Sequence, residues 1–288
     1  MEFLKKIFAP ITATLSFIGK HFKALIFLLI LYVLFFSNGA NINANLVEIK
    51  LQGEIIDPSA VLNKIYKASD DDNIRGVLIN IDSPGGAFSP SIELEEAIKL
   101  LSKKKTTIVY ASGTMASGSY LSGVWANKIY ANKGSFIGSI GVIMQGLDIS
   151  NLAAKIGIKE QVVKVGEFKE AGTIMREWNQ KERESLQQLA GKSYELFINE
   201  VATARKLDIN ATDKWANAKV FLAQEAKELG LIDGISNYKD VKKIVETQSG
   251  VTVPLWQENP PFEKFFANLE NSSKMAIKSL FETKILAK

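Results

Sequence analysis

Short β-rich runs alternate with amphipathic runs along most of this chain, and the alternation constrains its fold more than any other feature. Strands are expected at 46–51, 76–81, 107–111, 128–131, 140–144 and 161–165, and helices at 58–67, 92–101, 117–125, 152–156, 181–206 and 219–229. Strands that are separated by helices favour βαβ units, which build a parallel sheet. The sequence therefore predicts an α/β fold, and Gly230 is a favourable C-cap after the last helix.

The helical run at 181–206 carries an apolar stripe, and the simplest interpretation of this stripe is packing against the core. Its members are Leu186, Leu189, Leu196, Phe197 and Val201. No internal repeat of the kind that builds solenoids is visible along the chain.

The chain has no cysteine and a single histidine, His21. Without cysteine it has no thiol nucleophile, no thiolate metal site and no disulfide. Because His21 lies ahead of an apolar run near the N-terminus, the main domain has no imidazole for a Ser-His-Asp triad or a His-based zinc site. The formal net charge is only +4, which argues against a nucleic-acid partner. Any hydrolytic chemistry in the main domain therefore needs a different base.

The N-terminal part of the chain combines a basic segment, residues 1–23, with an uninterrupted apolar run, residues 24–36. Four lysines precede the run, and the first charge after it is Glu48. This asymmetry predicts a transmembrane anchor that leaves the N-terminus inside and the rest of the chain outside. The run is shorter than the roughly 20 residues of a typical spanning helix, and Phe17 and Phe22 extend its apolar character backwards.

A cleaved signal peptide is the alternative for this region, because a basic segment before a short apolar run fits that role too. Cleavage after Ala40 would place Asn38 at the −3 position, and cleavage after Ala44 would place Ile42 there. Signal peptidase sites prefer a small residue at this position, so the uncleaved anchor is the favoured interpretation.

Changes in composition set the other expected boundaries. A polar linker, residues 37–45, joins the anchor to the main domain, residues 46–249. The tail, residues 250–288, contains three prolines followed by an apolar and basic stretch. This stretch fits an appendage, a partner helix or a helix on a membrane surface.

Two turns that follow predicted strands could carry chemistry, because α/β folds place ligands at strand ends. The turn at 82–86 (DSPGG) has consecutive glycines that let backbone N–H groups approach a substrate oxygen, although a plain tight turn explains its local sequence more simply. The segment 113–120 places serines just before a predicted helix, as a nucleophile or as an N-cap. Ser112, Ser117 and Ser119 all remain candidates for the nucleophile at this point.

Two further segments are weaker signals on their own. The run at 138–142 (GSIGV) is a cluster of small residues at the start of a predicted strand. The run at 166–172 (GEFKEAG) follows the strand predicted at 161–165 and contains Lys169. A lysine that acts as a base must be neutral, which requires burial or nearby positive charge. Only the position of Lys169 in a glycine-bounded loop favours it over Lys164.

Taken together, these segments resemble the signal peptide peptidase A family of bacteria in its short, membrane-anchored form. The resemblance covers roughly residues 46–240 and rests on the order of the motifs. A Pro-Gly-Gly turn is followed by a Ser-Gly nucleophile motif, a Gly-Ser-Ile-Gly-Val motif, a lysine followed by an acid, and a Gly-Leu-Ile-Asp ending at 230–233. No single motif is decisive, whereas the ordered set is specific.

The resemblance implies a crotonase-like, ClpP-like α/β fold with stacked βαβ units and a serine endopeptidase with a Ser-Lys dyad. It assigns Ser117 as the nucleophile, Lys169 as the general base and Ser139 as the hydroxyl that orients the lysine amine. It also implies an oxyanion hole formed by the backbone N–H groups of Gly86 and Gly118. The expected substrates are cleaved signal peptides and other short or unfolded polypeptides, cut after small or apolar residues.

The same resemblance implies a homo-oligomeric ring on the extracytoplasmic side of a bacterial inner membrane, with membrane lipid contacted through the anchor. The reaction scheme needs neither metal nor cofactor. Three other functions stay open: an acyl-CoA enzyme on the same fold, which an outside orientation disfavours, a non-catalytic membrane scaffold, and a Ser-Lys protease directed at one membrane protein.

One departure from the family pattern surrounds the nucleophile. The family usually reads Ala-Ala-Ser-Gly-Gly, whereas this chain reads Met115-Ala116-Ser117-Gly118-Ser119. Met115 takes the place of an alanine and Ser119 the place of a glycine. Both replacements bear on the shape of the pocket and on the second oxyanion donor.

Overall fold

The computed structural model describes residues 2–36 and 44–257 and divides the chain into two units. One unit comprises Asn45–Leu255, and the other comprises Met1–Ala44 with Trp256–Lys288. The expected linker is described only at 44–45, and most of the expected tail, including Pro260 and Pro261, lies outside the described residues.

In the second of these units, the helix α1 (Glu2–Phe36) covers both the basic segment and the apolar run. Several of its aromatic side chains are exposed, including Phe17, Phe22 and Phe27. Among the residues that the structure describes, no helix combines the length and the apolar character needed to cross a membrane. The transmembrane anchor expected at 24–36 stays a prediction.

The unit Asn45–Leu255 is a mixed α/β structure, as the alternation predicts. Its strands are β1 (Leu46–Gln52), β2 (Gly76–Ser83), β3 (Thr106–Ala116), β4 (Lys128–Ala131), β5 (Phe136–Gly138), β6 (Val220–Leu222) and β7 (Gly234–Ile235). Its helices are α2 (Ser59–Asp70), α3 (Phe88–Lys104), α4 (Gly118–Gly123), α5 (Ser150–Lys155), α6 (Gln180–Arg205), a 3₁₀ turn at Ile209–Ala211, α7 (Thr212–Trp215), α8 (Ala223–Glu228) and α9 (Tyr238–Gln248).

The sheet divides at its longest strand, β3. Strands β1, β2, β3, β4 and β7 lie side by side in that order and all run parallel. The first part of β3, around Ile108–Ala111, pairs with β4, whereas its last part, Thr114–Ala116, pairs with β5. Strand β6 then adds to β5 in the antiparallel direction. The end of β3 is therefore held by a different partner strand from its beginning.

Helices cover both faces of the sheet around β2 and β3. Asn80 and Tyr110 lie on the face toward α9, where the ring of Tyr110 contacts that of Tyr238. Ile81 and Val109 lie on the face toward α4. Side chains alternate along a strand, so the six consecutive buried residues at the start of β2 show that this strand is covered on both faces.

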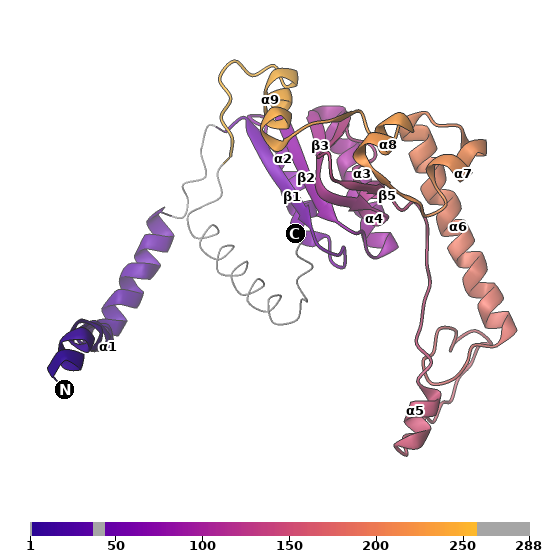
Figure 1. Ribbon diagram of the computed structural model, residues 1–288, viewed down its shortest axis with the longest axis horizontal. Coiled ribbons are helices and arrows are strands. Elements are labelled where there is room, and N and C mark those ends of the chain that lie inside the picture. Colours follow the sequence, from indigo (N-terminus) through magenta and orange to yellow (C-terminus); the bar gives the residue numbers. More distant parts are fainter. Residues whose placement is uncertain (1, 37–43, 258–288) are drawn as a thin grey trace. The chain divides into compact units, whose positions relative to one another are not determined.

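The long helix α6 connects this sheet to an excursion that we call the arm, residues 141–190. The chain leaves the end of β5, passes through α5 and returns along α6 (Figure 1). The side chain of Asn179 and that of Glu182 form a capping box that starts the helix. At the other end, Arg205 donates to Asp233 at 3.0 Å, and Asp233 also accepts from the N–H of Ile129 at 2.8 Å. The acid of the Gly-Leu-Ile-Asp motif thus ties α6 to β4.

The arm is also where the sequence-based expectations fail. The strands expected at 140–144 and 161–165 are not formed, and the short strand β5 lies just before the first of them. Within the described residues these β-rich runs have no partner strand, so Val163 and Val165 are almost fully exposed. The helix expected at 219–229 begins instead as strand β6, because this segment pairs with β5.

The apolar stripe of α6 is only half explained by core packing. Phe197 and Val201 are buried as expected, whereas Leu189 and Leu196 are 53% and 43% exposed. The part of α6 that lies on the arm therefore presents apolar side chains to solvent. The expectation that the entire stripe packs in the core is wrong.

Candidate active site

The nucleophile turn lies at the junction of β3 and α4. Ser117 sits between Ala116, the last residue of β3, and Gly118, the first residue of α4. Its φ of 53° is unusual for a residue with a side chain, and its N–H donates to the carbonyl of Gly138 at 2.8 Å. A sharp, strained turn from a strand into a helix leaves the half-buried Ser117 side chain at the carboxyl end of β3. This placement is the one a serine nucleophile requires.

A second turn, residues 83–86, lies directly against the nucleophile turn. A Cβ atom on Gly85 would come within 2.6 Å of the Gly118 nitrogen and 2.8 Å of the Ser117 Cβ. Gly85 also has a φ of 96°, a left-handed backbone that favours glycine. The two turns are thus so close that only a glycine fits between them.

The N–H groups of Gly86 and Gly118 are the candidate oxyanion donors. Ile55 holds the second turn on its other side, since its N–H donates to Gly85 and its carbonyl accepts from Ala87, both at 2.8 Å. This pairing leaves the Gly86 N–H pointing away from Ile55. A Cβ on Gly118 would lie 3.4 Å from the Gly86 nitrogen. Among the backbone hydrogen bonds of the described residues, neither N–H donates to a protein acceptor.

Ser139 lies beside Ser117 because β5 pairs in parallel with the end of β3. Ala116 is in register with Gly138, so the next residue of each strand, Ser117 and Ser139, follow side by side. The backbone of Ser139 is also left-handed, with a φ of 49°, and its N–H donates to the carbonyl of Lys219 at 2.7 Å. The structure therefore brings together four of the five residues expected at the site.

Lys169, the fifth residue, is not brought to Ser117 within one chain. Its side chain is exposed on the arm. The neighbouring Glu170 accepts from Arg176 at 3.1 Å, and Arg176 donates to Glu182 in the first turn of α6. Near its other end α6 reaches the region of α4, where Glu200 accepts from Trp125 at 2.7 Å. Glu182 and Glu200 are about 27 Å apart along the helix at a rise of 1.5 Å per residue.

The loop that carries Lys169 is nevertheless held by ion pairs. Lys164 and Arg176 both contact the Glu170 carboxylate, and these hydrogen bonds lower the pKa of Glu170. Arg176 also makes two hydrogen bonds to Glu182, which together with the N–H of Asn179 lower the pKa of Glu182 to about 2. Lys164, Glu170, Arg176 and Glu182 therefore form a chain of ion pairs that holds the loop to the start of α6.

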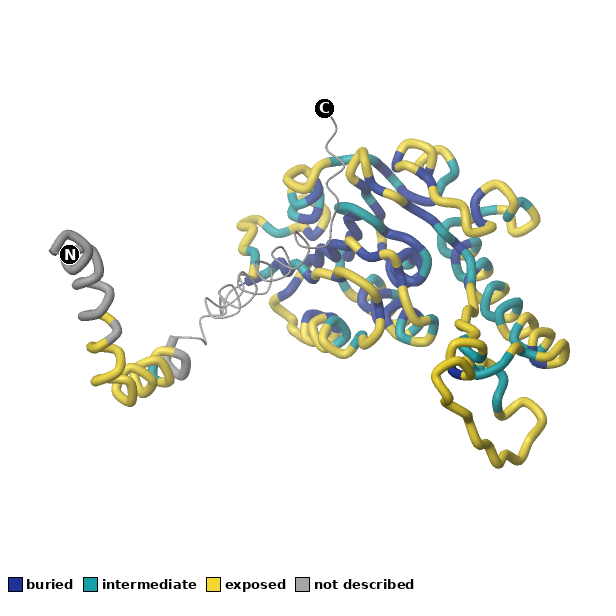
Figure 2. Tube along the Cα trace, turned by 60° about the horizontal axis from the view of Figure 1, so that its bottom comes forward, coloured by how far each residue is buried: buried dark blue, intermediate teal, exposed yellow. Residues whose placement is uncertain are grey.

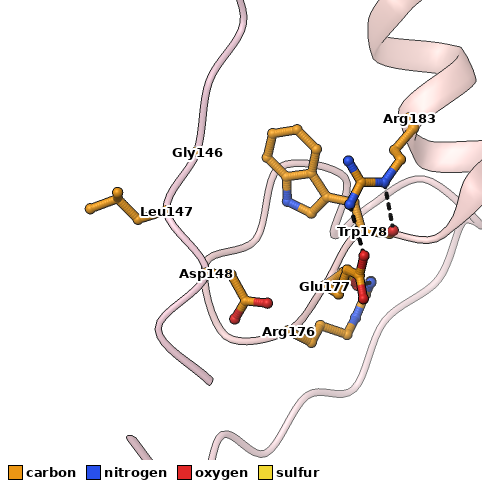
Figure 3. A pocket seen from close by; sticks show the side chains of 7 residues that line it. All are labelled: Gly146, Leu147, Asp148, Arg176, Glu177, Trp178 and Arg183. Atoms are coloured by element: carbon orange, nitrogen blue, oxygen red, sulfur yellow. Dashed lines mark hydrogen bonds and ion pairs between the residues drawn. The ribbon is translucent and has the colours of Figure 1, made fainter. Parts of the chain in front are cut away.

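Two hollows lie on the arm. One, of about 300 Å³, is lined by the segment of Gly146 and Leu147 and by Trp178 and Arg183. Figure 3 shows the Arg183 side chain beside the Trp178 ring, with hydrogen bonds to the Trp178 carbonyl and to Glu177. The other hollow, of about 730 Å³, lies between residues 142–144 and the exposed side of α6. Neither hollow includes any of the five expected site residues.

Both departures from the family pattern face the interior. The methyl group of Met115 would lie 2.7 Å from a Cβ on Gly123, so the absent side chain of Gly123 makes room for the methionine. Ser119 is fully buried, and its hydroxyl is hydrogen-bonded to the backbone. These two residues therefore shape the support of the nucleophile turn, which the local sequence alone could not show.

The structure offers no alternative metal-dependent site in the part of the chain that it describes. No group of three or more histidine, cysteine, aspartate or glutamate side chains in this part is arranged to hold a metal ion. The arrangement at Ser117 is instead suited to nucleophilic attack with the oxyanion held by backbone N–H groups.

Comparison with known proteins agrees with this arrangement. Residues 99–252 match the model of peptidase family S49. A protein of Methanocaldococcus jannaschii, provisionally named a protease, is 33% identical over 193 residues, which cover 67% of this chain and 62% of that protein. A protein of Synechocystis, also provisionally named a protease, is 32% identical over 188 residues, which cover 65% of this chain and 68% of that protein.

A third relative carries a more specific name. A protein of Enterococcus faecium, provisionally named signal peptide peptidase SppA, is 28% identical over 192 residues. The matched residues cover 66% of this chain and 56% of that protein. The chain therefore spans less than two thirds of the length of the first and third of these relatives.

Proposed function

The chain belongs to peptidase family S49, and from this premise we propose that it is a serine endopeptidase with Ser117 as its nucleophile. The observation that carries the proposal is the contact between the strained Ser117 turn and the glycine turn at 83–86. Two backbone N–H groups, those of Gly86 and Gly118, are free there to bind the oxyanion of a tetrahedral intermediate. Such donors are each worth roughly 3–4 kcal/mol in other hydrolases.

The proposed general base is Lys169 of a neighbouring copy of the same chain. Within one chain Lys169 is exposed on the arm, so a second copy would have to supply the amine to each Ser117. Burial at such an interface would favour the neutral amine that a base requires. Ser139, which lies beside Ser117, would accept or donate a hydrogen bond that orients this amine.

The apolar surface of the arm supports the association of several copies. The exposed apolar side chains of this surface are Ile143, Leu147, Ile156, Val163, Val165, Phe168 and Leu189. Exposed apolar patches of this kind commonly mark protein–protein interfaces. The arm would carry a base to a serine on another copy, and where each copy serves the next one this contact is heterologous and closes into a ring.

In the proposed reaction, neutral Lys169 takes the hydroxyl proton of Ser117 as the oxygen attacks a peptide carbonyl. The amide nitrogen leaves with a proton from the lysine, and an acyl group remains on Ser117. Water then attacks this ester, again with the lysine as base, and restores the serine. The substrates we propose are cleaved signal peptides and other short or unfolded polypeptides, and the relative named signal peptide peptidase SppA supports this choice.

We further propose that the N-terminal helix holds the enzyme at the inner membrane of a bacterium, with the unit Asn45–Leu255 on the extracytoplasmic side. The four lysines ahead of the apolar run and the exposed aromatic side chains of α1 support this orientation. Carbonate extraction of membranes and protease accessibility of intact spheroplasts test it. Release into the soluble fraction, or protection from external protease, would contradict it.

Digestion of an unfolded polypeptide such as casein tests the proposed activity. The full chain should degrade casein, and the Ser117→Ala variant should not, while both give the same circular dichroism spectrum and melting temperature. A serine-reactive fluorophosphonate should label the wild type and not the variant. Equal casein turnover by wild type and Ser117→Ala would exclude Ser117 as the nucleophile.

A non-catalytic membrane scaffold is the second candidate, and the separation of Lys169 from Ser117 within one chain favours it. A scaffold would bind unfolded polypeptides without turnover and would leave Ser117 unlabelled. The same labelling experiment therefore separates the two functions.

A further inference from the structure

Four serine side chains are buried beneath the two turns that meet at Ser117, namely Ser83, Ser91, Ser119 and Ser122. Buried hydroxyl groups are costly unless they are hydrogen-bonded, so a cluster of them at one place calls for an explanation. Ser91 donates to the carbonyl of Ala87, the N-cap of α3, and Ser122 donates to the carbonyl of Gly118 in α4, with the Ser91 carbonyl at 3.2 Å as a second acceptor. These bonds lie within and between the two helices and involve no strand.

Ser119 differs because it bonds to two separate strands. The N–H of Ala116, at the end of β3, donates to the Ser119 hydroxyl oxygen at 2.8 Å. The carbonyls within reach of the Ser119 hydroxyl as acceptors are that of Ser83, at the end of β2, at 2.7 Å and that of Ala116 at 2.9 Å. One hydroxyl thus joins the residue before the nucleophile to the start of the glycine turn.

The link continues from Ser83 to the expected oxyanion donor. The N–H of Gly85 donates to the Ser83 hydroxyl oxygen at 3.2 Å, and Gly86 is the next residue. The register of β2 with β3 shifts between Ile81 and Ser83 and resumes at the pair of Ser83 with Met115. Ser119 adds a side-chain bond between the two strand ends beside this last backbone pair.

We propose that Ser119 is a positioning residue that fixes the distance between Ser117 and the Gly86 N–H. The inference rests on the proposed function, since it assigns a role within the same site. It also separates Ser119 from the other candidate nucleophiles, because the Ser119 hydroxyl is fully buried and already bonded. The residue that departs from the family's glycine thereby gains a specific task in this chain.

The proposal makes alanine a worse substitute than glycine at this position. In Ser119→Ala the methyl group fills the space and removes the side-chain partner of the Ala116 N–H and of the Ser83 carbonyl. In Ser119→Gly the vacated space can admit a water molecule that bonds to both groups, as buried waters do at polar sites. If the serine acted only by filling space, alanine would be the better substitute, because it is closer to serine in volume.

Steady-state kinetics on an unfolded polypeptide substrate, with the full chain, tests this ranking. We expect Ser119→Ala to lower kcat about tenfold with KM changed less than about twofold, and Ser119→Gly to lower kcat by a smaller factor. Ser135→Ala is the matched control, because Ser135 is also a buried serine that donates to a backbone carbonyl, that of Ala111 at 2.8 Å. This control should lose a similar amount of stability and keep its kcat.

Amide hydrogen exchange provides a second readout that needs no turnover. Ser119→Ala should speed exchange in both turns, residues 83–86 and 116–119, by about tenfold, whereas Ser135→Ala should leave both unchanged. Equal kcat in wild type and Ser119→Ala, an alanine variant faster than the glycine variant, or unchanged exchange in the turn at 83–86 would each overturn the proposal. If casein turnover is unaffected by Ser117→Ala, the proposed function fails, and the exchange experiment still decides the role of Ser119.

Discussion

The nucleophile turn is packed and hydrogen-bonded within one chain, whereas the arm leaves much of its apolar surface exposed. Around Ser117, every element is packed: Gly85, Gly118 and Ser119 are buried, and the backbone bonds of Ser117 and Ser139 are made within the same chain. On the arm, the β-rich run that precedes Lys169 is exposed and unpaired in the described structure. Figure 2 shows this contrast as mostly buried residues in the sheet and mostly exposed residues around the arm.

The serine and the lysine of the proposed dyad therefore depend on different kinds of interaction. The serine, its neighbouring hydroxyl and the oxyanion donors are positioned by the fold of a single chain. The lysine sits on a surface whose apolar side chains would gain free energy by being covered.

Removal of the Lys169 amine should abolish turnover without affecting the fold. We expect Lys169→Ala to lower kcat by about a thousandfold, in the range typical of a lost general base. Lys159→Ala is the control, because Lys159 is also an exposed lysine of the arm. Turnover is measured on casein, and the melting temperature of both variants should match that of the wild type. Full activity of Lys169→Ala would remove Lys169 from the mechanism.

The next largest loss of kcat is expected when a side chain forces the two turns apart. In Gly85→Ala the new Cβ would approach the Gly118 nitrogen and Ser117, so we expect kcat to fall by about a hundredfold as one oxyanion donor is displaced. Gly157→Ala is a matched control, because Gly157 also has a left-handed backbone, with a φ of 78°, but open space around it. Both variants carry the same kind of backbone strain. Equal loss of kcat in the two would show that contact between the turns is unimportant.

Charges on the arm's apolar surface should weaken both assembly and activity. Val163→Asp places a carboxylate at a side chain that is fully exposed in one chain and would be covered in the assembly. We expect a shift toward monomer in size-exclusion chromatography with light scattering, and about a tenfold loss of activity at low protein concentration. Leu100→Asp, on exposed α3 surface, should change neither. A monomeric Val163→Asp variant with full activity would contradict the proposed supply of lysine by a second copy.

The smallest predicted effect concerns the place where α6 meets the rest of the unit. Glu95 is buried, its Oε1 atom accepts no hydrogen bond from the described residues, and the Lys99 ammonium lies 3.5 Å away. Burial raises the pKa of Glu95 to about 7, opposed by Lys99, while Glu200 of α6 and Glu96 of α3 raise it further. The folded state therefore holds a proton that the unfolded chain loses at lower pH.

Stability should accordingly fall as the pH rises from about 4.5 to about 7, because over this range the folded state binds more protons than the unfolded state. Glu95→Gln should remove a contribution to this slope on the order of 1–3 kcal/mol, measured by urea unfolding at several pH values. Glu96→Gln, on the exposed side of α3, should leave the slope nearly unchanged. An unchanged slope in Glu95→Gln would show that the buried carboxyl titrates normally.

Much of the fold could be predicted from sequence, because the strands β1, β2 and β4 and the helix α6 are read from local periodicity alone. The end of β3 and the strand β6 could not, since β3 is extended by a second partner strand and β6 exists through pairing with β5. The β-rich runs of the arm mislead for the opposite reason. Their side chains fit a sheet, but no strand among residues 44–257 pairs with them.

The site shows the same limit. The order of motifs singled out Ser117, Ser139, Gly86 and Gly118, whose proposed roles stay predictions, and the structure places these residues together through the register of β3 with β5 and the contact between the turns. The inward roles of Met115 and Ser119 could not be read locally, because they depend on Gly123 and Ser83 across the fold. The separation of Lys169 depends on the length of α6 and on the arm's ion pairs.

A mixing experiment tests most directly whether serine and lysine come from different copies. Ser117→Ala and Lys169→Ala are each expected to be inactive on their own. The two variants carry different affinity tags and are coexpressed. Purification through both tags in turn then yields only assemblies that contain both variants. In a ring with random neighbours, about one quarter of the sites would combine an intact serine with an intact lysine, so about a quarter of wild-type casein turnover should return. Mixed assemblies that stay inactive would contradict the account, because a dyad within one chain cannot be restored by mixing.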